Sequence, residues 1–199
     1  MLSIARIREL ISKNEIQQRP EYHASIASDN NKRLRPAAIM MPLVIDDGEW
    51  HLLFTRRSKS LAEHSGQVSF PGGAKEDGDK DLEEAALRET QEEIGVKPED
   101  IMVFGDLGNM PILTGYLVRP FVGNIPWPYP IRISHEEVES IFTIPLEWLA
   151  DPDHHYVRHR NIDSQEIPVV YFDHYKGHQL WGFSAEMTLI LIKTLELID

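Results

Sequence analysis

The stretch of residues 71–95 constrains this chain most, because a glutamate-rich segment in it lies between glycines. Its central part has no Gly or Pro and is rich in Leu, Ala and Glu, which predicts a helix that stops at Gly95. At about 3.6 residues per turn, Glu89 and Glu93 share a stripe with apolar side chains, and Glu92 lies beside Glu89. Carboxylates therefore border the apolar face of this helix.

This placement of the carboxylates has two readings. Acidic helix faces are usually solvated, and that is the simpler reading. However, like charges four residues apart repel, and partial burial raises the pKa of clustered carboxylates. A hard divalent cation would relieve both effects, and oxygen ligands favour Mg²⁺ or Mn²⁺ over zinc.

Charge and composition limit the partners. Of the 199 residues, 20 are Lys or Arg and 32 are Asp or Glu, which gives a net charge of −12. Such an excess disfavours binding of long nucleic acids. The absence of cysteine excludes disulfides and thiolate zinc sites. No apolar run approaches the roughly 20 residues of a membrane span, so we expect a cytoplasmic protein without membrane contact.

Hydrophobic patterning predicts a mixture of helices and strands without a regular βαβ rhythm, which indicates the α+β class in one domain over residues 1–199. An N-terminal helix and arm occupy residues 1–33. The other predicted elements are strands at 37–45, 50–55, 68–70, 101–107 and 116–122, a strand followed by a helix start at Pro145, a hairpin at 156–162 and 167–173, and a helix at 183–198.

The glutamate-rich stretch resembles the Nudix box, the signature of the Nudix hydrolase superfamily, over about residues 73–96. The box reads G-x5-E-x7-R-E-U-x-E-E-x-G-U, where U is apolar. Thr90 replaces an apolar residue, and Asp79 replaces the first Glu with eight rather than seven residues before Arg88. The resemblance implies the Nudix fold, an α/β/α sandwich with a mixed β-sheet. The residues in register are Arg88, Glu89, Glu92, Glu93, Gly95 and Val96.

Residues 53–73 are similar to the motif of the coenzyme A pyrophosphatase branch, L-L-T-x-R-S-x3-R-x3-G-x3-F-P-G-G. Phe54 replaces the second Leu, and Ala62 replaces the second Arg. Residues 178–188 resemble the I-W-G-x-T-A entry of that branch into its C-terminal helix. The matching motif residues are Thr55, Arg57, Ser58, Gly66, Phe70, Pro71, Gly72 and Gly73.

The resemblance implies a hydrolase that directs water to one phosphorus of a nucleoside diphosphate derivative, with Mg²⁺ or Mn²⁺ bound. Glu89 and Glu93 are the first expected metal ligands and Glu92 the third. Arg88 would hold a carboxylate in position. Glu92 is our first choice as general base, and Glu137, in an acidic stretch at 134–142, is the alternative.

The substrate phosphates are expected at a basic cluster of Arg56, Arg57 and Lys59, although an exposed basic turn explains these residues as well. The Gly72-Gly73 turn is permissive backbone that can approach a ligand closely. Coenzyme A or a derivative, cleaved to 3′,5′-ADP and 4′-phosphopantetheine, is the favoured substrate. ADP-ribose or another nucleotide sugar is the alternative, and a non-catalytic nucleotide-binding module is a third reading. A homodimer through residues 123–131 is left open.

Overall fold

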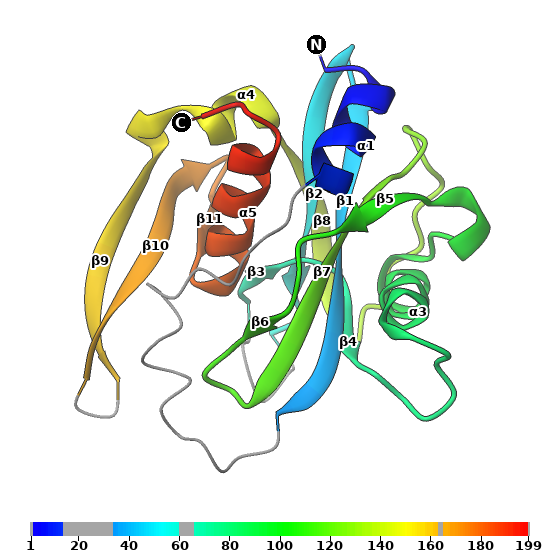
Figure 1. Cartoon of the computed structure of the whole chain (residues 1–199), viewed down its shortest axis with the longest axis horizontal. Coiled ribbons are helices and arrows are strands. Elements are labelled where there is room, and N and C mark those ends of the chain that lie inside the picture. The colour runs from blue at the N-terminus through cyan, green and yellow to red at the C-terminus, as the bar shows by residue number, and fades with distance from the viewer. Residues whose placement is uncertain (1, 14–33, 60–65, 163–164, 199) are drawn as a thin grey trace.

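The computed structural model describes residues 2–13, 34–59, 66–162 and 165–198. Its strands form one large sheet and one small sheet, with helices around them (Figure 1). The elements are α1 (Ile4–Lys13), β1 (Arg35–Asp46), β2 (Glu49–Arg57), β3 (Val68–Ser69), β4 (Gly72–Ala74), α3 (Leu82–Ile94), β5 (Met102–Asp106), β6 (Met110–Pro111), β7 (Tyr116–Asn124), β8 (Val138–Pro145), α4 (Leu146–Ala150), β9 (His155–Ile162), β10 (Gln165–Tyr175), β11 (His178–Trp181) and α5 (Phe183–Thr194).

The large sheet is mixed and is organised around β1. Strand β1 pairs antiparallel with β2 and β4, and parallel with β7. The β1–β2 hairpin turns at Asp47 and Gly48, whose φ angles of 48° and 83° match the twist of the flanking strands. β8 extends the sheet beyond β2, and β5 extends it beyond β7. The small sheet is antiparallel in the order β11-β10-β9.

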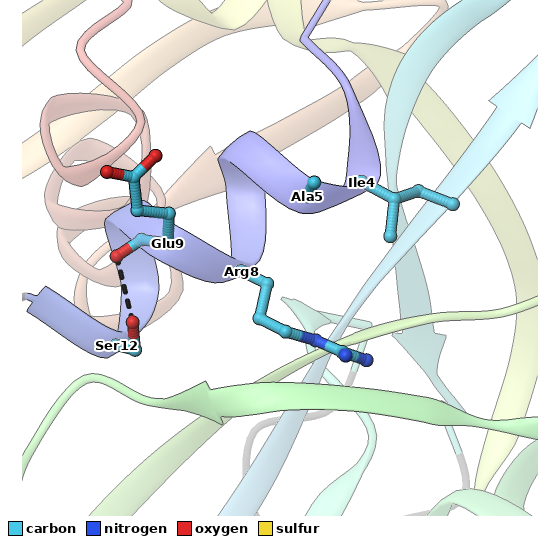
Figure 2. Close-up of a pocket in the computed structure, with 5 residues that line it drawn as sticks. All are labelled: Ile4, Ala5, Arg8, Glu9 and Ser12. Atoms are coloured by element: carbon cyan, nitrogen blue, oxygen red, sulfur yellow. Dashed lines mark hydrogen bonds between the residues drawn. The ribbon is translucent and has the colours of Figure 1, made fainter.

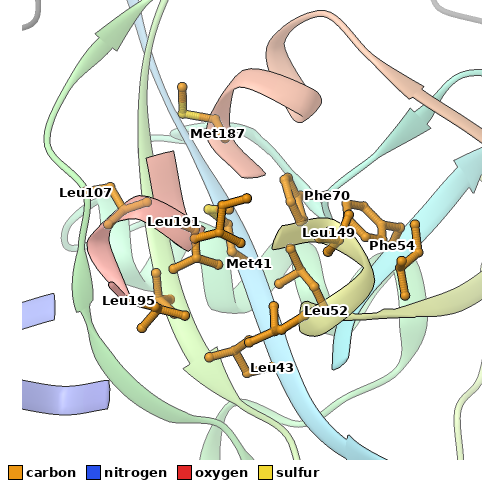
Figure 3. Packing of buried hydrophobic residues seen from close by; sticks show 14 of the residues in the cluster. Met41, Leu43, Leu52, Phe54, Phe70, Leu107, Leu149, Met187, Leu191 and Leu195 are labelled. Carbon is orange, nitrogen blue, oxygen red and sulfur yellow. The ribbon is translucent and has the colours of Figure 1, made fainter. Parts of the chain in front are cut away.

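Helices cover both faces of the large sheet, as the predicted sandwich requires. On one face α3 packs through Ala85, Ala86 and Ile94 against a cluster that includes Leu53 of β2. On the other face α1, α4 and α5 pack on a second cluster that includes Phe54 (Figure 3). Successive strand residues point to opposite faces, so strands β1, β2, β5 and β7 supply side chains to both clusters.

The ends of α3 are determined by local sequence. The side chain of Asp81 caps the first turn by accepting a hydrogen bond of 3.0 Å from the backbone N–H of Glu84. Gly95 ends the helix in the left-handed conformation, with φ of 73°, and its N–H donates to the carbonyl of Gln91 at 2.9 Å. The glutamate-bearing helix thus begins and ends as the sequence predicts.

Several details differ from the sequence predictions. The helical spacing of Ile4, Ile7, Leu10 and Ile11 predicts one buried stripe on the first helix, but Ile4 is 38% exposed because it lies at the helix start. The last helix ends at Thr194 and not at residue 198. Strands β4, β6 and β11 were not predicted, since two to four residues carry too little periodicity. Among the described residues, no helix is both long and apolar enough to cross a membrane.

Candidate active site

Glu93 is the most buried carboxylate of the candidate site. Its residue exposure is 3%, and its Oε1 accepts a hydrogen bond of 3.2 Å from the backbone N–H of Gly72. Burial raises the pKa of Glu93 to about 8, against the opposing effects of the Gly72 hydrogen bond and the nearby positive charge of Arg57. The negative charges of Glu89 and Glu137 raise this pKa further.

Glu89 lies one helical turn before Glu93 and is also largely buried, with a side-chain exposure of 15%. Burial raises the pKa of Glu89, while its contact with Arg88 lowers it. Its carboxylate occupies the space beside Gly73, where a Cβ atom would overlap both carboxylate oxygens. Gly73 is therefore required for this carboxylate to lie against the β4 backbone.

Arg88 is held by a buried aspartate that the sequence analysis assigned no role. Its Nε and Nη2 donate to the two carboxylate oxygens of Asp79 at 3.0 and 3.1 Å. Asp79 has a side-chain exposure of 3%, and the Arg88 hydrogen bonds lower its pKa. The Nη1 of Arg88 then donates to Glu89 and to Glu92, each at 2.9 Å. Arg88 thus connects the loop before α3 to two glutamates.

Helical periodicity predicts Arg88 toward the side of α3 opposite the apolar face, but the structure places it differently. The side chain is only 22% exposed, because its Nη2 also donates to the carbonyl of Ala74 at 3.2 Å. The cause is the turn of residues 75–80, which carries Asp79 back to the helix. Asp79 stands at the position of the first Glu of the Nudix box, with one additional residue before Arg88, and this match was the sequence signal for its role.

Arg56 and Arg57 do not form one basic cluster. They are neighbours on β2 and so point to opposite faces of the sheet. Arg57 lies on the α3 side and acts on the pKa of Glu93, and its Nε is buried. Arg56 pairs with Glu139 at 3.3 Å. Of the two predicted phosphate-binding arginines, the structure brings only Arg57 to the carboxylates.

Glu92 and Glu137 occupy different positions relative to the buried pair. Glu92 has a 56% exposed side chain and is bound to Arg88. Glu137 lies near enough to Glu89 and Glu93 for its charge to raise the pKa of both. Its loop is tied to the site, because the N–H of Ser58 donates to the Glu137 carbonyl at 2.8 Å.

The carboxylates were tested as possible metal ligands. Across residues 2–13, 34–59, 66–162 and 165–198, no three His, Asp or Glu side chains are grouped closely enough to hold a metal ion. The pair of Glu89 and Glu93 nevertheless fits a hard cation. Both supply oxygen donors, and burial raises the pKa of both, so a bound cation would offset the cost of ionising them. Glu92 fits less well, because its side chain is 56% exposed and lies outside the buried pair.

Other sequence candidates lie elsewhere. Trp127 and Tyr129 are aromatic residues that could stack on a nucleobase, but both pack against the buried cluster between α3 and the large sheet. This supports a packing role. Ala62 and His64 are outside the described residues. A pocket of about 450 Å³ lies along α1 and is not part of the candidate site (Figure 2). Its lining residues are Ile4, Ala5, Arg8, Glu9 and Ser12.

Comparisons with known proteins identify the family. Residues 33–165 match the model of the NUDIX domain, and the chain therefore belongs to the Nudix family. It is a Nudix hydrolase, of a family that generally uses divalent metal ions and acts on small nucleotide compounds. The predicted Nudix resemblance is thus confirmed.

Two curated relatives support this membership. A protein of Photorhabdus laumondii is 38% identical over 159 residues, which cover 79% of this chain and 82% of the relative. A protein of Cronobacter sakazakii is 40% identical over 153 residues, which cover 76% and 78%. Both are described as the uncharacterized Nudix hydrolase NudL.

A solved structure supports the fold. The MutT/nudix family protein from Enterococcus faecalis aligns with a TM-score of 0.56 and 14% identity. The alignment covers 98% of this chain and 75% of that chain. The α+β fold with a mixed sheet and flanking helices is therefore the Nudix fold, as the sequence predicted.

Proposed function

We propose that this Nudix pyrophosphohydrolase acts on coenzyme A or its derivatives and releases 3′,5′-ADP and 4′-phosphopantetheine. The observation that carries the chemistry is the pair of buried carboxylates, Glu89 and Glu93, against the Gly72-Gly73 turn. The substrate proposal depends on the coenzyme A pyrophosphatase motif over residues 53–73.

Three residues of that motif, Arg57, Gly72 and Gly73, lie at the two carboxylates, which supports a role in substrate binding. Thr55 is fully buried, and its hydroxyl lies 3.0 Å from that of Ser69, so β2 and β3 are held together. Arg57 follows on β2 beside Glu93. We propose that its guanidinium contacts a phosphate group of the substrate, and its effect on the pKa of Glu93 supports this.

Glu89 and Glu93 would hold the divalent cation, Mg²⁺ or Mn²⁺, with Glu92 as a further candidate ligand. The bound ion would neutralise phosphate charge and lower the pKa of coordinated water. Arg88 orients Glu89, and Asp79 in turn orients Arg88 through its two hydrogen bonds. Cleavage adds one water across the pyrophosphate bond and yields two phosphomonoesters.

Glu137 is our proposed general base ahead of Glu92. Its carboxylate lies near the buried pair and makes no described hydrogen bond to an arginine, whereas Glu92 accepts one from Arg88. A base must reach the proton of the attacking water while remaining able to accept it. The Glu137→Gln and Glu92→Gln variants test this choice. The variant that lacks the general base should have a much lower kcat with little change in KM, and we expect this of Glu137→Gln.

A substrate panel tests the function. The protein is incubated with Mg²⁺ or Mn²⁺ and with coenzyme A, ADP-ribose, NADH or dinucleoside polyphosphates, and products are identified by mass. We expect 3′,5′-ADP and 4′-phosphopantetheine from coenzyme A. Turnover of ADP-ribose alone would support the nucleotide-sugar alternative. No turnover with either metal would support the non-catalytic binding module.

A single variant tests the site in the same assay. Glu93→Gln should lower turnover by several orders of magnitude, because it removes the proposed metal-binding carboxylate. It should leave the far-ultraviolet circular dichroism spectrum unchanged, since the amide has the same shape. Glu83→Gln is the matched control, because Glu83 is an exposed glutamate on the same helix. A near-normal rate for Glu93→Gln would remove Glu93 from the proposed metal site.

Two organisational proposals accompany this function. We propose that residues 1–199 form a single domain and that a homodimer, if present, uses residues 123–131. Light scattering after size-exclusion chromatography measures the mass in solution. A monomeric mass would remove the dimer proposal.

A further inference from the structure

The outer face of the small sheet carries a row of parallel aromatic rings. Tyr156, Tyr171 and Trp181 lie on three adjacent strands, β9, β10 and β11. Neighbouring ring centroids are 5.7 and 5.9 Å apart, with interplanar angles of 7° and 8°. On the opposite face of this sheet, Val170 and Phe172 pack in the same buried cluster as α5, so the row of rings occupies the face that α5 does not cover.

Two arginines of β9 extend over this row. Arg158 lies 4.9 Å from the Tyr156 ring centroid and 5.8 Å from that of Tyr171. Arg160 lies 5.4 Å from the Tyr171 centroid and 4.7 Å from that of Trp181. Both guanidinium groups therefore converge on the ring of Tyr171.

The two arginines are exposed, and neither has a carboxylate partner in the part of the chain that the structure describes. This is notable in a chain with a net charge of −12. The rings hold the guanidinium faces by cation–π contact, which leaves the N–H edges available. Two positive charges that converge without a counter-ion repel each other, and a bound anion would offset that repulsion.

The hydroxyl of Tyr171 gives an independent indication of a ligand. Tyr171 is only 4% exposed, and its hydroxyl is buried with no hydrogen-bond partner among the described residues. A buried hydroxyl without a partner is costly, because it loses its hydrogen bond to water. By contrast, the hydroxyl of neighbouring Tyr156 accepts a hydrogen bond from Gln179 at 3.5 Å. The unsatisfied group thus belongs to the ring that both arginines share.

We propose that Arg158, Arg160 and the Tyr171 hydroxyl form a binding site for a phosphate group, either as inorganic phosphate or as a phosphomonoester. The arginines are two residues apart on one strand, so their Cα atoms are separated by about 7 Å on the same face. Each planar guanidinium supplies paired N–H donors that match phosphate oxygens. The Tyr171 hydroxyl supplies a third donor.

This site is separate from the candidate active site. Helix α3 and strand β9 lie on opposite sides of the molecule (Figure 1). None of the three proposed donors contacts Glu89 or Glu93 in the described structure. The inference therefore does not rest on the proposed function and can fail or succeed independently of it.

The arginine side chains report binding directly. The protein of residues 1–199, kept metal-free with a chelator to prevent binding through metal at α3, is titrated with inorganic phosphate. The Nε–H resonances of Arg158 and Arg160 are followed by NMR and assigned with Arg→Lys variants. We expect both resonances to shift saturably. Absence of a shift in millimolar phosphate would overturn the proposal.

Variants measured by calorimetry assign the donors. Tyr171→Phe keeps the ring and removes the hydroxyl, and it should weaken phosphate affinity about tenfold. The Arg158→Gln/Arg160→Gln double variant should lose measurable binding. If that variant does not fold, Arg158→Lys/Arg160→Lys keeps the charge without the planar donors and should bind less tightly. Unchanged affinity in the folded variants would overturn the proposal.

A matched control and a second probe complete the test. Arg35 lies 5.3 Å over the ring of Tyr116 and is an exposed cation–π arginine, and no other arginine of the described residues lies over that ring. Arg35→Gln should leave phosphate affinity unchanged, and an equal loss would overturn the site. Adenosine 5′-monophosphate distinguishes the ligand source. Tighter binding than phosphate indicates a phosphomonoester site, and equal binding indicates a site for the phosphate group alone.

Discussion

The carboxyl group of Glu93 should make the stability of the metal-free protein fall as pH rises. Burial raises its pKa from 4.5 to about 8. Between these two values the folded state holds a proton that the unfolded state has released, so the free energy of unfolding decreases with pH. The stability is fully present below the unfolded pKa of 4.5 and is lost as pH passes the folded value.

The size of this effect follows from the same interval. Each pH unit between the two pKa values is worth about 1.4 kcal/mol, so the complete loss is up to roughly 5 kcal/mol. Glu93→Gln removes the ionisable group and keeps an acceptor for the Gly72 N–H. We expect the variant to match the native protein near the unfolded pKa and to be several kcal/mol more stable in mild alkali.

Urea unfolding in the presence of a chelator, followed by circular dichroism across this pH interval, measures the difference. Glu83→Gln is again the control and should retain the pH dependence of the native protein. Parallel loss of stability in the native protein and in Glu93→Gln would refute the assignment of the effect to Glu93. Added Mg²⁺ should stabilise the native protein at high pH more than the variant, since binding to the folded state raises stability.

Three further predictions concern the supports of the site. Asp79→Asn should lower the free energy of unfolding at neutral pH by about 3 kcal/mol, because it removes the buried negative charge that accepts two hydrogen bonds from Arg88, and urea unfolding measures this. Gly73→Ala should reduce turnover strongly at a stability cost of about 1 kcal/mol, since the added Cβ overlaps only the Glu89 side chain. Gly72→Ala should cost about 3 kcal/mol or more of stability, because its Cβ would overlap the β1 backbone and its φ is 156°. A chelator should abolish turnover, and either Mg²⁺ or Mn²⁺ should restore it; turnover that persists after dialysis against chelator would contradict a metal requirement.

Much of the site was predictable because α3 is defined locally. Its cap residue, its terminal glycine and its stripe of Glu89 and Glu93 all follow from helical periodicity. The prediction that Arg56 and Arg57 act together was wrong, because adjacent residues of a strand point to opposite faces of the sheet. That alternation is visible in the sequence, but the face that meets Glu93 depends on which helix packs on which side of β2.

The acidic helix, the glycine turn and the α+β class were therefore determined by the sequence, since each depends on residues close together in the chain. The tertiary structure decided which carboxylates are buried. Gly72 contacts Glu93, 21 residues further along the chain, and Asp79 reaches Arg88 only through a folded turn. The phosphate site proposed on β9–β11 has the same origin, because Trp181 joins Tyr156 and Tyr171 only when three strands pair. Local patterns specify which chemical groups are present, and long-range packing specifies their desolvation and hence their charge.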